Sequence, residues 1–103
     1  MSDDKYWRDA SGRFTFSMLH VPAVGYREVC MAISKTFQLI PMNTLVSNSV
    51  DIIFQDYRLG EQVVGLEWDN WMGFTVVSKT PTSESLVREI GAWLSKSQWA
   101  TEL

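Results

Sequence analysis

The fold follows from residues 50–78, which read VDIIFQDYRLGEQVVGLEWDNWMGFTVVS. Two runs rich in β-branched and aromatic residues, Val50–Tyr57 and Gln62–Trp68, flank a four-residue turn that contains a glycine. A second turn at residues 69–70 leads into a third run, Phe74–Ser78. Short connections of this kind bring neighbouring strands together in antiparallel order. The sequence therefore predicts a three-stranded meander.

The segments before the meander supply one strand and one helix. Residues 13–21 alternate between apolar and polar side chains, which is the period of a half-buried strand. Residues 24–39 instead place apolar side chains on one stripe of a helix. Residues 40–47 fit either a short edge strand or an extended connection, and Pro41 favours an edge position because it has no N–H to donate.

A second helix is predicted near residues 81–96, with Thr80 as its N-cap and Pro81 at the first helical position. The resulting order, β-α-(β)-β-β-β-α, predicts an α+β fold. We expect an antiparallel sheet of four to five strands with both helices packed on one face, and an opposite face that is partly open to solvent.

The N-terminal segment is separate from this pattern. Residues 1–12 are polar and end in a Ser-Gly pair, so we expect a flexible arm in front of a single domain over 13–103. The aromatic segment Tyr6–Arg8 is unusual for such an arm. It either docks on the open face of the sheet or binds a partner.

Composition limits the class of protein. Apolar residues make up 46% of the chain and charged residues 20%, as expected for a folded protein. The formal net charge of -3 argues against binding to nucleic acid or an anionic membrane, and it is compatible with a basic protein partner. No apolar run is long enough to span a membrane, and the acidic N-terminus leads into no secretory signal. With Cys30 as its lone cysteine, the protein is expected in the cytoplasm.

The sequence contains no recognisable catalytic, metal-binding or phosphate-binding motif. The carboxylates of the meander do not converge as a glycosidase pair, and one His with one Cys supplies no metal-ligand set. Cys30 lies on the apolar stripe of the first predicted helix, where a thiol is inert, which disfavours a catalytic pair with His20. The glycines form no phosphate-binding loop. We therefore expect no enzymatic activity, no cofactor and no metal.

Tryptophan is the remaining signal, with five in 103 residues. Trp68 and Trp71 flank the Asp69-Asn70 turn, and in a two-residue hairpin they would share a face. One interpretation is that the rings cover the end of the core. The other is a partner-binding surface in which the rings supply buried area and Glu67, Asp69 and Asn70 supply hydrogen bonds. A carbohydrate-like ligand stacked on exposed tryptophans is the alternative function.

The meander, followed by KTPTSESLVREI at residues 79–90, resembles the layout of small uncharacterised bacterial proteins and of immunity proteins of contact-dependent toxin systems. The resemblance covers roughly the C-terminal half of the chain and transfers no residue roles. It implies a cytoplasmic, non-catalytic protein that acts through one tight interface with another protein, either as an immunity protein or as an effector chaperone.

Overall fold

The computed structural model describes residues 5–18, 21–42, 45–47 and 52–100. One antiparallel sheet runs through these residues in the order β1-β2-β7-β6-β5-β3, and β4 also pairs with β5. Its strands are β1 (Tyr6–Arg8), β2 (Phe14–Met18), β3 (Ile40–Pro41), β4 (Val46–Ser47), β5 (Ile52–Leu59), β6 (Gln62–Asp69) and β7 (Gly73–Ser78). The two α-helices are α1 (Tyr26–Phe37) and α2 (Glu84–Ser95).

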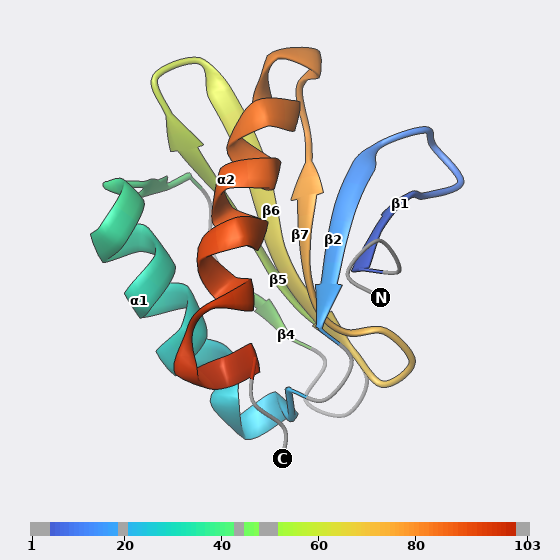
Figure 1. Ribbon diagram of the computed structural model, residues 1–103, viewed down its shortest axis with the longest axis vertical. Helices are drawn as coiled ribbons and strands as arrows, with labels where there is room; N and C mark the ends of the chain where they lie inside the picture. The colour runs from blue at the N-terminus through green and yellow to red at the C-terminus, as the bar shows by residue number, and fades with distance from the viewer. Residues whose placement is uncertain (1–4, 19–20, 43–44, 48–51, 101–103) are drawn as a thin grey trace.

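Both α-helices cover the same face of the twisted sheet, with α2 lying across β7 and β2 and α1 beside β5 (Figure 1). The predicted α+β class and antiparallel order are therefore confirmed. The predicted number of four to five strands is too low, because six strands follow one another across the sheet and β4 adds a further piece. The extra strands have two or three residues, too few to show a period in the sequence.

The meander has the predicted antiparallel order, β5 with β6 and β6 with β7, but its first connection has two residues rather than the predicted four, because Leu59 pairs with Gln62. Its first turn contains Gly60, whose φ of 61° is in the left-handed region that favours glycine. The register places Leu66 beside Val76, and Val76 beside Phe16 of β2. These three side chains are 0% exposed and form the centre of the core beneath the helices.

The edge of the sheet beside β5 is interrupted. Ile40 of β3 pairs with Arg58, and Val46 of β4 pairs with Phe54. Ile40 and Val46 are six positions apart in the sequence, whereas their partners Arg58 and Phe54 are four positions apart. The edge therefore has two more residues than the stretch of β5 that it lies beside. Pro41 lies in this edge, as its missing N–H predicts, and β3 and β4 are two separate pieces of it.

The start of the C-terminal helix agrees with its sequence signal. Thr80 and Ser83 form a capping box around the 3-10 turn Pro81–Ser83, which leads directly into α2. The apolar stripe of α2, Leu86, Val87, Ile90 and Leu94, is buried. Gly91 lies on the same stripe and is buried too.

Residues 6–8 of the predicted flexible arm are instead part of the sheet. They form β1, which pairs with β2 and extends its edge rather than docking on its face. Tyr6 stacks on Phe14, with ring centroids 5.4 Å apart, and donates a hydrogen bond to the backbone oxygen of Arg88 in α2. Arg8 adds a salt bridge of 2.8 Å to Glu84. These contacts give the short segment enough packing to hold it as a strand.

Candidate functional site

The two tryptophans of the predicted site do not share a face. Trp68 lies on the helix-covered face and is 9% exposed, and its Nε1 donates a hydrogen bond of 2.8 Å to the backbone oxygen of Val21. Trp71 lies in the turn between β6 and β7 and is 75% exposed. The shared face expected for a two-residue hairpin is therefore not formed. Trp68 belongs to the core, and its indole offers little area on which a carbohydrate-like ligand could stack.

The turn itself explains this difference. β6 ends at Asp69, and its partner Gly73 starts β7, so three residues lie between them rather than two. Oδ1 of Asp69 accepts hydrogen bonds from the backbone N–H groups of Trp71 at 2.8 Å and Met72 at 2.6 Å. Gly73 closes the turn with a φ of 68°. Phe74, rather than Trp71, is consequently the residue opposite Trp68.

The side of the sheet away from the helices carries exposed apolar residues. Phe54 pairs with Val46 on one side and with Glu67 on the other, and cross-strand partners share a face. Ile52 lies two positions from Phe54 and hence on that face too. We call this side the helix-free face. Its exposed apolar residues at the β5 edge are Ile40, Val46, Ile52 and Phe54.

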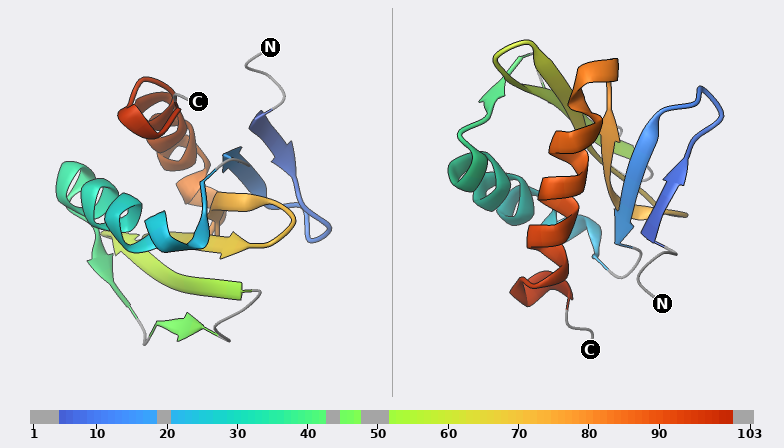
Figure 2. Two further views of the ribbon diagram at one scale, coloured as in Figure 1. Left: turned by 90° about the horizontal axis from the view of Figure 1, so that it is seen from below. Right: turned by 45° about the horizontal axis from the view of Figure 1, so that its top comes forward.

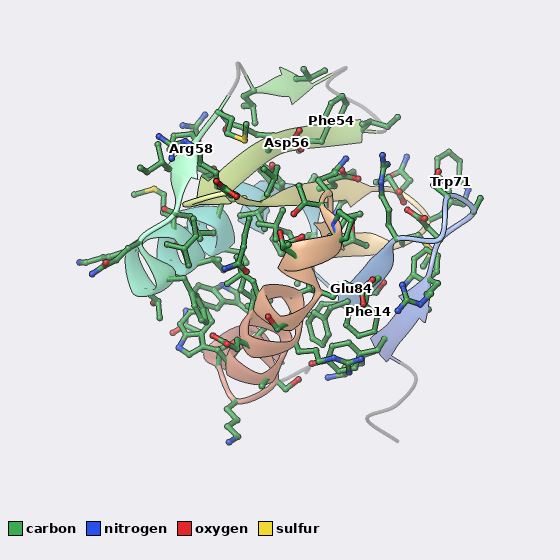
Figure 3. The ribbon with its side chains drawn as sticks, turned by 90° about the horizontal axis from the view of Figure 1, so that it is seen from above. Phe14, Phe54, Asp56, Arg58, Trp71 and Glu84 are labelled. Carbon is green, nitrogen blue, oxygen red and sulfur yellow. The ribbon has the colours of Figure 1, made fainter. Side chains whose placement is uncertain are left out.

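Figure 3 shows that Phe54 and Trp71 both lie on the side of the sheet away from α2, whereas Phe14 lies on the side of α2. The turn that holds Trp71 is therefore on the same side as the exposed residues of β5. At the opposite edge of this face, Nε1 of Trp7 donates a hydrogen bond to Oγ of Ser17. The helix-free face thus has an indole at each side and apolar residues along β5.

An ion-pair cluster occupies the middle of this face. Nζ of Lys79 lies 2.9 Å from Oε2 of Glu67 and 3.8 Å from Oδ1 of Asp56. The lysine reaches both carboxylates by passing over Gly65, where an added Cβ would lie 2.5 Å from its Cε. Glu67, one of the predicted site residues, is thus already engaged by a neighbouring lysine. Side-chain exposures of 21% for Lys79 and 30% for Glu67 leave the cluster accessible from one side.

A hollow of about 310 Å³ lies beside this cluster. Its lining brings together three predicted site residues, Glu67, Trp68 and Asp69. It also includes Ile52 and Phe54, which are not among the predicted site residues. A signal for them was present, since three consecutive apolar residues at 52–54 place large side chains on both faces of a strand. Asn70 is exposed in the turn beside Trp71.

The burial and pKa of the Cys30 thiol are unlike those of a catalytic nucleophile. Cys30 lies in α1 and is 3% exposed. Burial raises the pKa of its thiol to about 12, so the group is protonated at neutral pH, whereas a reactive cysteine needs a lowered pKa. His20 lies outside the described residues. Within the described part of the chain, no group of three or more His, Cys, Asp or Glu side chains is placed to hold a metal ion.

Comparisons with known proteins give no relative from which a function could be transferred: no protein-family model, no curated protein and no solved structure matches this chain. None of the helices in the described ranges has the length and apolar character needed to cross a membrane.

Proposed function

We propose that this protein is a non-catalytic protein-binding module that covers a partner with its helix-free face. The concentration of exposed apolar residues supports this. Nine large hydrophobic side chains among the described residues are exposed, and four of them, Ile40, Val46, Ile52 and Phe54, gather on this face at the β5 edge. Exposed apolar groups gathered at one place, rather than scattered singly, mark an interaction surface.

The composition of this surface also favours a protein partner. Trp71 and Phe54 are aromatic anchors of the kind that dominate binding energy at protein interfaces. Asp69, Glu67 and Asp56 add carboxylates around them, and the chain has a formal net charge of -3. Carboxylates at the rim accelerate association with a partner of opposite charge. The proposed partner is therefore a protein with a basic surface, and the mechanism is occlusion, as in an immunity protein or an effector chaperone of the cytoplasm.

The test is capture of the partner from lysate of the native host, followed by mass spectrometry, with single substitutions that separate this surface from the rest. Phe54→Asp and Trp71→Ala should each reduce recovery of the same protein at least about tenfold, the loss expected for a hot-spot residue. Val24→Asp is the matched control, because Val24 is 91% exposed and lies in the 3-10 turn Ala23–Gly25 that precedes α1.

Two results would contradict the proposal. One is recovery of the same protein at an unchanged level with both the Phe54 and Trp71 variants. The other is equal loss with Val24→Asp, which would mean that any new charge on the surface prevents capture. Circular dichroism of each variant confirms that the fold is retained before binding is compared.

A further inference from the structure

A second cavity lies on the other side of the sheet, between α1 and β5. It has a volume of about 400 Å³, within the range of pockets that hold small molecules. Figure 2 shows α1 lying over the β5 end of the sheet, to one side of α2. Ala23, Met31, Leu45 and Ile53 give the cavity an apolar lining. Met31 is 64% exposed and Leu45 39%, so apolar surface extends from the cavity to its mouth.

Polar side chains enter this cavity from both β5 and α1. Gln55 and Tyr57 enter from β5, and Arg27 enters from the first turn of α1. The hydroxyl of Tyr57 donates a hydrogen bond to Oε1 of Gln55 over 3.4 Å, which is long for an O–H donor. A ligand oxygen at a shorter distance would compete with Gln55 for this hydroxyl.

The charge that lines the cavity is positive. Burial raises the pKa of Tyr57 to about 12 and that of Cys30 to about 12, so both groups are neutral at pH 7. Arg27 is the only charged residue among those that line the cavity in the described part of the chain. It forms no salt bridge with a described acidic residue, and its charge acts on the hydroxyl of Tyr57. The electrostatics of the cavity thus favour an anion.

We propose that the cavity between α1 and β5 binds a small amphipathic carboxylate, such as a medium-chain fatty acid. The apolar chain lies among Ala23, Leu45 and Ile53, and the carboxylate accepts hydrogen bonds from Arg27 and from the hydroxyl of Tyr57. A guanidinium pairs with a carboxylate through two parallel hydrogen bonds, which fixes the orientation of such a ligand. This site is separate from the helix-free face, so the inference does not rest on the proposed function.

The experiment is a titration of the ¹⁵N-labelled protein with decanoate, followed by amide chemical shifts. Saturable shifts are expected at residues 23–31 and 53–57, with none in the turn that contains Trp71. Arg27→Gln should weaken binding at least about tenfold, because a charge-assisted hydrogen bond is lost. Arg58→Gln is the matched control: it removes the same charge from the opposite face of β5 and should leave the affinity unchanged.

Two further measurements distinguish recognition of the carboxylate from general apolar binding. Decanamide, which has the same chain without the charge, should bind more weakly than decanoate and should bind equally to wild type and Arg27→Gln. Ala23→Trp should fill the cavity and abolish binding of both probes while the protein stays folded. The proposal is overturned if decanoate shifts show no saturation, if they map elsewhere, or if Arg27→Gln and Arg58→Gln bind decanoate equally well.

Discussion

The hydroxyl of Tyr6 lies in the space that a side chain at Gly91 would occupy: a Cβ on Gly91 would stand 2.5 Å from it. The same Cβ would stand 2.8 Å from Cδ1 of Phe16. Glycine within a helix costs about 1 kcal/mol relative to alanine. Here it lets α2 approach β1 and β2 closely enough for Tyr6 to reach the backbone oxygen of Arg88.

Gly91→Ala should therefore destabilise the protein by about 1–3 kcal/mol, the usual cost of overpacking, despite the better helix propensity of alanine. Urea unfolding measures the change. Gly25→Ala is the control, since Gly25 has a φ of -87° and its added Cβ would meet Val21 at an ordinary 3.6 Å. Equal stability of both variants would mean that Tyr6 and Phe16 move aside without cost.

Substitutions of the two tryptophans in the β6–β7 hairpin should differ strongly in their effect on the free energy of unfolding. Trp68→Ala should cost about 3–5 kcal/mol, because it empties a core site and removes the hydrogen bond to Val21. Trp71→Ala should change the free energy of unfolding by less than about 0.5 kcal/mol, because its ring is 75% exposed. Chemical denaturation of both variants checks this, and a large loss in the Trp71 variant would show that its indole packs on the domain.

Lys79 and Glu67 should be energetically coupled. A double-mutant cycle with Lys79→Met and Glu67→Gln should give a coupling free energy of about 0.5–1 kcal/mol, since the pair is only partly exposed. The coupling should decrease at high salt, which screens exposed charges. Unfolding of the four proteins at low and high ionic strength provides the measurement. Additive effects at both salt concentrations would exclude a contribution of this pair to stability.

The stability of the protein should fall at alkaline pH. Burial raises the pKa of Cys30 from 9.0 to about 12, so between these values the unfolded chain loses a proton that the folded chain keeps. Deprotonation then favours the unfolded state, and the free energy of unfolding decreases as the pH rises from 9.0 towards about 12. Tyr57, raised from 10.0 to about 12, acts in the same direction.

Replacing the thiol isolates its part of this effect. Cys30→Ala should have a shallower pH dependence of unfolding than wild type, by at most about 1.4 kcal/mol per pH unit, the value for a single proton. Its cavity lowers stability at every pH and so does not alter the slope. Parallel curves for the two proteins over this range would show that the thiol does not keep its proton on folding.

The elements predicted best are those whose signals are local. The meander and α2 each combine a clear period with a turn glycine or a cap at the expected place. β1 was missed because three residues show no period and because its position depends on Gly91, far along the chain. Residues distant in sequence also decide the ion-pair cluster, since Lys79 reaches Asp56 only through the register of three strands and the absence of a side chain at Gly65.

The candidate site was predicted only in part, because its geometry depends on the length of one turn. A two-residue turn would have paired Trp68 with Trp71, whereas the glycine at position 73 sets a three-residue turn and separates them. The sequence did contain this signal, since Asp69 and Gly73 are spaced as the ends of such a turn. Trp71 and Glu67 remain on the proposed surface, whereas Trp68 belongs to the core on the other side of the sheet.

The two-piece edge formed by β3 and β4 has a consequence for self-association. An incoming strand would need a continuous ladder of N–H and C=O groups, whereas Pro41 has no N–H to donate and β3 and β4 have only two residues each. The exposed apolar residues at this edge would otherwise make it a place for fibrils to grow. The same irregularity allows the protein to expose an apolar surface to a partner while hindering the pairing of edge strands from two copies of the chain.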